Sequence, residues 1–215
     1  MKIAKKVFIY IIGLFFMATG VTLSIKSQLG ISPLNSVPYV VSVITGIDQG
    51  HLIIVYFSIF VLGQFLILRK DFKLFYVIQV GFLTLFGYFV TFTKFILSFQ
   101  PPDNYVLQLA LLILSIASLA LGLVLYLRAD IIPMPAEGFV IALQKIIDKE
   151  FYKIKYIMDT LLVVLSTVLS FAFLGELDGV REGTLLAALL IGRTMGIIEK
   201  VFSKQLKSLI NFMEK

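Results

Sequence analysis

The chain has 215 residues, of which 59% are hydrophobic and only 15% charged, with a mean hydropathy of +0.99 and a net charge of +6. A soluble domain of this length cannot bury so much apolar surface, so the composition predicts an integral membrane protein whose first partner is the lipid bilayer. The cations flank apolar segments, which argues against nucleic acid as a partner. Cysteine is absent, so disulfides and thiol chemistry play no part.

Six apolar runs are long enough to cross a bilayer. The first, at 7–25, follows a basic start and has no small-residue cleavage site after it, so we expect a retained helix rather than a signal peptide. The others lie at 52–68, 74–93, 106–127, 156–174 and 184–199. Two further runs, 34–47 and 134–147, are apolar but only about 14 residues long, which suits a re-entrant or interfacial segment better than a full crossing.

The two halves of the chain repeat each other at a constant offset of 102 residues. In this register Gly20, Lys26, Pro33 and Gly81 match Gly122, Arg128, Pro135 and Gly183. We therefore predict one membrane domain built from repeat one at 1–103 and repeat two at 104–215, each with three spans and a broken segment, at 27–47 and 129–147. Two copies with three crossings each insert in opposite orientations, so the expected fold is all-α and polytopic, with six spans and two half-helices in two inverted-topology repeats.

The distribution of cations supports six spans with both termini in the cytoplasm of a bacterial inner membrane. Of the 19 Lys and Arg, only Lys26, Lys94 and Arg181 then lie outside, Arg193 lies in the last span, and 15 lie inside. If both short segments crossed fully, the split would weaken to 12 against 6.

The broken segments are the first candidate for function. Four residues interrupt the helices there: Gly30, Pro33, Pro133 and Pro135. Because proline is favoured in the first turn of a helix, we expect half-helices to begin at Pro33 and Pro135, with Ser32 capping the first and Met134 or the backbone alone capping the second. Half-helix N-termini that dip into the bilayer offer N–H donors and positive partial charge to a small polar solute, with an anion as one expected class. Helices that lie on the membrane surface remain an alternative for both segments.

Charged residues inside the spans are the second candidate. An ionisable group there costs about 2.5–3.5 kcal/mol on insertion scales, so Asp159 and Arg193 should face water or a partner, which could be each other. Solvation of Asp159 at the inner interface and snorkelling of Arg193 remain the alternatives. The mid-span amides are expected to join helices by hydrogen bonds, with lining of a pathway as the alternative: Gln64, Gln79 and Gln108. Six tyrosines lie mostly near segment ends, as interface anchors do: Tyr39, Tyr56, Tyr76, Tyr105, Tyr126 and Tyr156. The candidate ligand-binding residues are Lys26, Ser32, Asn35, Arg128, Asp130, Glu137, Asp159 and Arg193.

Part of the first repeat has the form Gly20-x5-Lys26-x2-Leu29-Gly30-x-Ser32-Pro33, followed by Ile44-Thr45-Gly46-Ile47-x2-Gly50. This stretch resembles the signature of the YczE/YitT-type family of bacterial membrane proteins, with Leu34-Asn35 in place of Trp-Asp. The second half, around Gly183-Thr184-Leu185-Leu186, is similar to the same family's second half. The resemblance implies a permease-like protein and names no substrate.

Together these features predict a membrane transporter that binds a small polar solute at the interface of two inverted repeats. The alternative is a non-transporting accessory or scaffold subunit of another membrane or secretion system. The protein partner would then be another membrane protein or a second copy of the chain. No G-x-S-x-G, H-E-x-x-H or P-loop motif occurs, so we expect no enzyme activity, no catalytic residues, no cofactor and no metal.

Overall fold

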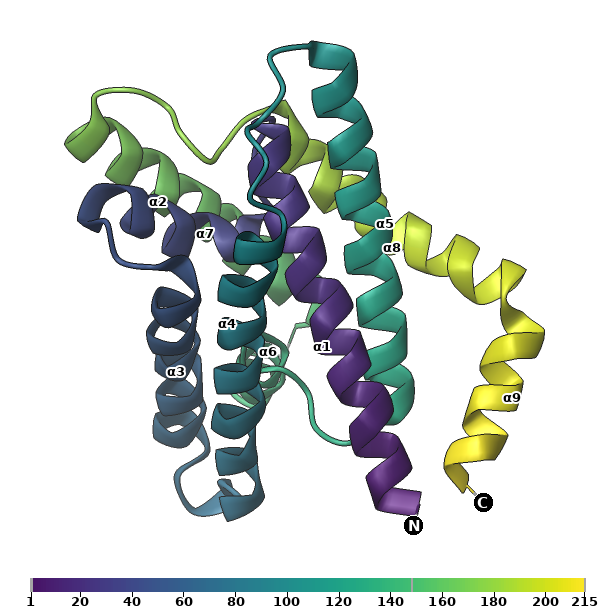
Figure 1. The fold of residues 1–215 in the computed structure, drawn as a ribbon. Coiled ribbons are helices and arrows are strands. Elements are labelled where there is room, and N and C mark those ends of the chain that lie inside the picture. Colours follow the sequence, from purple (N-terminus) through teal and green to yellow (C-terminus); the bar gives the residue numbers. More distant parts are fainter. Residues whose placement is uncertain (1, 148, 215) are drawn as a thin grey trace. The chain divides into compact units, whose positions relative to one another are not determined.

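The computed structural model describes residues 2–147 and 149–214, and every regular element in this part of the chain is a helix (Figure 1). The predicted all-α class is thus confirmed for these residues. The helices are α1 (Lys2–Ser27), α2 (Pro33–Thr45), α3 (Gln49–Leu68), α4 (Ile78–Ile96), α5 (Tyr105–Ala129), α6 (Pro135–Gln144), α7 (Phe151–Leu174), α8 (Glu182–Val201) and α9 (Ser203–Glu214), with two 3-10 turns, η1 (Arg69–Asp71) and η2 (Leu74–Val77), between α3 and α4.

Five helices among the described residues are long and apolar enough to cross a membrane by length and composition: Lys2–Ser27, Gln49–Asp71, Phe75–Ile96, Tyr105–Ala129 and Phe151–Leu174. They correspond to the first five predicted spans. The sixth predicted span coincides with α8, which has 20 residues but is not one of these five. Several apolar helices of spanning length fit a membrane protein.

The two short helices begin at the prolines that the sequence singles out. Helix α2 starts at Pro33 and α6 at Pro135, where Met134 is the N-cap residue and its side chain makes no capping hydrogen bond. They contain 13 and 10 residues, so at 1.5 Å per residue they are about 20 and 15 Å long. Neither helix alone can cross a hydrocarbon core of about 30 Å. Before α2 the chain turns at Gly30, whose φ of 108° favours glycine, and Pro133 lies in the turn before α6.

The chain divides into two compact units. The first contains Met1–Ser32, Phe89–Ile131 and Arg181–Lys215, and the second contains Pro33–Tyr88 and Ile132–Val180. Each unit therefore combines segments from both halves of the sequence.

In the first unit, α1 and α5 pack so closely that their backbones touch. A Cβ atom on Gly13 would lie 2.8 Å from the carbonyl oxygen of Gly122, and one on Gly122 would lie 2.6 Å from the carbonyl oxygen of Gly13. Further along α1, a Cβ on Gly20 would lie 3.0 Å from the carbonyl oxygen of Ser115. Because positions rise along α1 as they fall along α5, the two helices are antiparallel. Small residues at such contacts let helices approach closely in apolar surroundings.

Hydroxyl groups hold these helices together. Ser115 Oγ donates to the carbonyl oxygen of Gly20 at 2.8 Å, and Ser118 Oγ donates to that of Phe16 at 2.8 Å. Hydrogen bonds of this kind supply association energy where the surroundings give no hydrophobic driving force.

In the second unit, each short helix packs on a long helix from the other half of the sequence: α2 on α7, and α6 on α3. Gly63 makes room on α3 for an aromatic ring of α6, because a Cβ at this position would lie 2.5 Å from Cε2 of Phe139. This contact brings the N-terminal part of α6 against the last third of α3.

Candidate ligand-binding site

The N-terminal turn of α6 is fixed by a pair of buried amides. Gln64 Nε2 donates to the carbonyl oxygen of Pro135 at 3.0 Å and to Oε1 of Gln79 at 3.0 Å, and Gln79 Nε2 donates back to Gln64 Oε1 at 3.4 Å. Both glutamines are only 1% exposed. The prediction that these amides join helices is confirmed: they connect α3, the start of α4 and the tip of α6.

An ion pair lies one turn into α7. Lys155 Nζ donates to both carboxylate oxygens of Asp159, each at 2.7 Å. The two residues are four apart and therefore share one face of the helix. Their side chains are 26% and 27% exposed, so the pair is screened less than a surface pair.

Glu137, the third residue of α6, places a buried carboxylate beside this ion pair. Its own backbone N–H donates to the carboxylate, which satisfies one of the N–H groups left free in the first turn of a helix. Lys155 and Asp159 are both close enough to act on its charge. Its Oε2 atom is buried and has no hydrogen-bond partner among the described residues. Buried polar atoms are nearly always paired, so such an atom indicates a ligand or another function.

Tyr56 of α3 brings a second unpaired polar atom near Asp159. Asp159 is close enough to act on its hydroxyl, and the Oη atom is buried without a hydrogen-bond partner in the described part of the chain. Its ring packs edge-on against Phe60 at 5.3 Å between centroids, and Phe60 packs against Phe139 at 5.4 Å. Tyr56 is thus not a simple interface anchor. We refer to Glu137, Lys155, Asp159 and Tyr56 as the Glu137 cluster.

At the other short helix, α2, the positions that match this cluster carry no charge. Counted from the starts of their helices, 102 residues apart in both cases, the matching positions are Asn35, Ile53, Phe57 and Met158. All four are buried, with exposed fractions of 7%, 0%, 2% and 8%. The same arrangement of a short helix on a long one therefore forms without charges at these positions. The charges of the Glu137 cluster are not a requirement of the fold, which indicates a functional role.

Two of the predicted ligand-binding residues, both cations, have partners within the first unit. Lys26 Nζ donates to the carbonyl oxygen of Phe99 at 2.6 Å, which fastens the end of α1. Arg128 binds Oε1 of Glu199 at 2.5 Å, and both side chains are more than 40% exposed.

The other predicted residues are dispersed. Ser32 and Asn35 are buried, with exposed fractions of 9% and 7%. Asp130 ends α5 in the left-handed conformation with φ 47°, and Arg193 is exposed on α8. Among the eight candidates, the structure brings together Glu137 and Asp159. It adds Lys155, which the four-residue spacing from Asp159 could have indicated, and Tyr56, for which the sequence carries no local signal.

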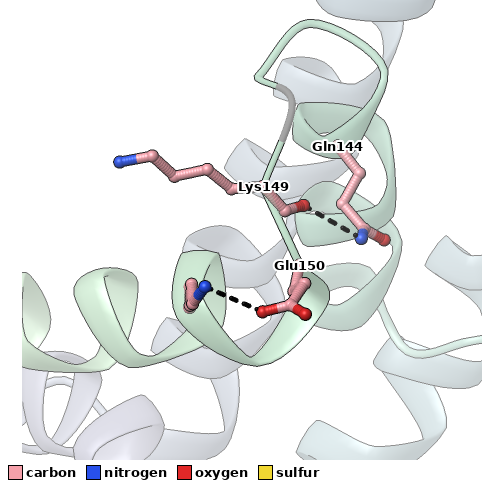
Figure 2. A pocket seen from close by; sticks show the side chains of 4 residues that line it. Gln144, Lys149 and Glu150 are labelled. Carbon is pink, nitrogen blue, oxygen red and sulfur yellow. Dashed lines mark hydrogen bonds and ion pairs between the residues drawn. The ribbon is translucent and has the colours of Figure 1, made fainter.

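A surface pocket of about 620 Å³ lies where α6 passes into α7 (Figure 2). Its polar groups pair with one another: Gln144 donates to the carbonyl oxygen of Lys149 at 3.3 Å, and Lys153 binds Glu150 at 2.9 Å. Hydrogen bonds from Tyr152 and Lys153 lower the pKa of Glu150. Because these groups are exposed and mutually satisfied, this pocket is a weaker candidate than the Glu137 cluster.

Fold and site together define an all-helical protein, with apolar helices of membrane-spanning length and a buried, partly charged cluster. A family model matches residues 4–200, and the chain belongs to that family, which is described as a family of unknown function (DUF6198). Comparisons with the curated proteins and with the solved structures gave no match.

Proposed function

We propose that this chain is a permease-like membrane transporter that binds a small polar solute at the Glu137 cluster. In this proposal the site lies where α3 from the first half of the chain meets α6 and α7 from the second. Helix α8 is the sixth span, the two halves are inverted repeats, and both termini face the cytoplasm of a bacterial inner membrane. Kinship with YczE/YitT-type proteins is part of the same proposal.

Reciprocal contacts in the first unit support inverted repeats. At the offset of 102 residues, Gly13 is equivalent to Ser115, and Gly20 is equivalent to Gly122. The contact of Gly13 with Gly122 and that of Gly20 with Ser115 are therefore one contact made twice. Contacts repeated in this way are a property of two-fold symmetry.

A contact between equivalent positions supports the same symmetry. Ser118 donates to the carbonyl of Phe16, and these residues are 102 positions apart. Equivalent residues meet where a two-fold axis passes between them. For antiparallel helices such as α1 and α5 this axis is perpendicular to both, so in a bilayer it would lie in the membrane plane.

The observation that carries the transport proposal is the buried, unpaired Oε2 atom of Glu137. Charged groups inside apolar helical proteins are costly, and they mark substrate or ion pathways when they are retained. The hydroxyl of Tyr56, near Asp159, is a second buried polar atom without a hydrogen-bond partner in the described part of the chain. The matching positions around Asn35 are buried and carry no charge. This comparison supports the view that the fold itself does not need charged groups at these positions.

The test is uptake into proteoliposomes that contain the full chain. A panel of labelled amines, amino acids, carboxylates and sugars is offered to the wild type, to Glu137→Gln and to Glu150→Gln. We expect uptake of at least one class, reduced about tenfold or more by Glu137→Gln, since a hydrogen bond to a charged group is worth roughly that much. Glu150→Gln removes an exposed carboxylate of the same unit and serves as the matched control.

Two results would contradict the proposal. The first is uptake that is equal in all three proteins. The second is no uptake of any class, together with co-purification of another membrane protein at fixed stoichiometry, which would make the chain an accessory subunit.

A further inference from the structure

We infer that the Glu137 cluster binds the ammonium group of a small organic cation. This assignment rests on the proposed function and names the chemical class of its solute. It differs from the anion that half-helix N-termini alone would favour.

The balance of charge in the cluster is the first reason. Two carboxylates, Glu137 and Asp159, stand against the single ammonium of Lys155. Both oxygens of Asp159 hold that ammonium at 2.7 Å, so Glu137 has no cation in direct contact with its Oε2 atom in the described part of the chain. A buried carboxylate without a paired charge is costly. A bound cation removes that cost, whereas a bound anion would add a third negative charge.

The unpaired atoms are the second reason. Glu137 Oε2 is an acceptor, and Tyr56 Oη accepts as well as donates. An ammonium group carries three N–H donors and no acceptor, so it can donate a hydrogen bond to either of these oxygens. A carboxylate ligand could use the hydroxyl of Tyr56 but would meet the like charge of Glu137.

Aromatic rings favour an organic cation over a metal ion. Tyr56, Phe60 and Phe139 form a continuous row of edge contacts, at 5.3 and 5.4 Å between neighbouring centroids. Aromatic faces attract ammonium groups, and the rings also accept the apolar part of an organic ligand. Hard metal cations instead require several oxygen ligands, and the described residues contain no group of three or more His, Asp or Glu that could hold a metal ion.

The uncharged positions that match the Glu137 cluster determine how many ammonium ions we expect the chain to bind. The positions that match Glu137, Lys155 and Asp159 are Asn35, Ile53 and Phe57, which carry no charge. We therefore expect one ammonium site, at α6, and no related site at α2.

The experiment measures equilibrium binding of radiolabelled methylammonium to the purified full chain in detergent. We expect saturable binding of one methylammonium per chain, weakened about tenfold or more by Glu137→Gln and a few-fold by Tyr56→Phe, and unchanged by Glu150→Gln. Excess sodium acetate should not compete, because a sodium ion has no N–H donors and acetate carries the same charge as the carboxylate of Glu137. Size-exclusion profiles identical to wild type show that the variants are folded. Asp159→Asn provides a second variant, since it too should weaken binding.

Three results would overturn the ammonium assignment: no saturable methylammonium binding up to molar concentration, binding that Glu137→Gln leaves unchanged, or displacement by sodium or acetate. Uptake measurements distinguish failure of the ammonium assignment from failure of the transport proposal. If an anionic or neutral solute is taken up in a Glu137-dependent way without methylammonium binding, transport stands and the cation is wrong. If Glu137→Gln affects neither binding nor uptake, both are wrong.

Discussion

Glu137 occupies in α6 the position that Asn35 occupies in α2, because each is the third residue of a short helix that begins at a proline. The long helices on which these two helices pack also match, since α3 and α7 begin 102 residues apart at Gln49 and Phe151. The same framework thus occurs twice. In one copy the carboxylate of Glu137 lies with an ion pair and a hydroxyl, and in the other the amide of Asn35 lies with apolar side chains. This contrast gives every substitution in the Glu137 cluster a natural reference within the same molecule.

Charge variants should change ammonium binding in opposite directions. Lys155→Met removes the competing internal cation, so the affinity for methylammonium should rise by about fivefold. Asp159→Asn releases Lys155 to compensate Glu137, so the affinity should fall by a similar factor. A charge a few ångströms away in a partly buried site changes a binding energy by about 1 kcal/mol. Equilibrium binding measures both; changes of the same sign in the two variants would be inconsistent with the cluster as described.

Protons should compete with the ammonium ligand. A proton on Glu137 Oε2 removes the charge that the ligand needs, so the affinity for methylammonium should fall as the pH is lowered, by up to about tenfold per pH unit once the carboxyl titrates. Lys155 and Asp159 on α7 are the other ionisable groups that act on this carboxylate, and Tyr56 on α3 lies near Asp159. Binding isotherms between pH 8 and pH 5 test the sign. Glu137→Gln should flatten the profile, and an affinity that rises on acidification would refute competition at this oxygen.

Gly122→Ala should destabilise the protein, although alanine is the better helix former. The new Cβ would lie 2.6 Å from the carbonyl oxygen of Gly13 and from the backbone nitrogen of Met17, and overpacking against atoms that cannot move aside costs about 1–3 kcal/mol. Gly192→Ala in α8 is the matched control, because nothing lies within 4 Å of its Cβ position. It should be neutral or stabilising by up to about 1 kcal/mol. Thermal unfolding in detergent, followed by far-UV circular dichroism, compares the two; equal effects would show that α1 and α5 are not in backbone contact.

Removing one of the paired amides should cost more than removing both. Gln64→Leu leaves the amide of Gln79, which is 1% exposed, buried without its partner, at a cost of about 1–3 kcal/mol. The double variant Gln64→Leu/Gln79→Leu should recover part of this loss, because no buried amide is then left unpaired. A double-mutant cycle from unfolding midpoints gives the coupling energy. Strictly additive effects would mean that the two amides do not interact.

Six spans can be tested directly, since the chain has no native cysteine to remove. Single cysteines replace Lys2, Asp103, Glu176 and Lys204, and an impermeant maleimide is added to intact cells. We expect labelling of Asp103→Cys and Glu176→Cys only, because the other two positions face the cytoplasm in the proposed topology. Labelling of Lys204→Cys from outside would show that α8 does not cross the membrane.

Local features of the sequence predict most of the helices. The apolar run at 106–127 becomes Tyr105–Ala129, and the prolines place the starts of α2 and α6. Helix α9, Ser203–Glu214, was not predicted, because its polar and charged residues interrupt any apolar run. The division into two compact units, each drawn from both halves, depends on contacts between distant segments and has no local signature.

The site is only partly predictable for the same reason. Glu137 and Asp159 stand out because a carboxylate in an apolar segment is costly. Lys155 differs in the sequence from the other cations around it only by its four-residue spacing from Asp159, and Tyr56 resembles any tyrosine near the end of a span. Their role depends on the register of α3 and α7 against α6, which glycine-to-ring and amide contacts determine.

The backbone contact between α1 and α5 limits how the proposed transport cycle could proceed. Where a glycine meets a peptide group, neither helix can slide or roll by even one ångström without a steric clash or the loss of the serine hydrogen bonds. These two helices therefore behave as a single rigid body throughout. We therefore expect conformational change in other helices, where the contacts between neighbours are made by the flexible ends of side chains.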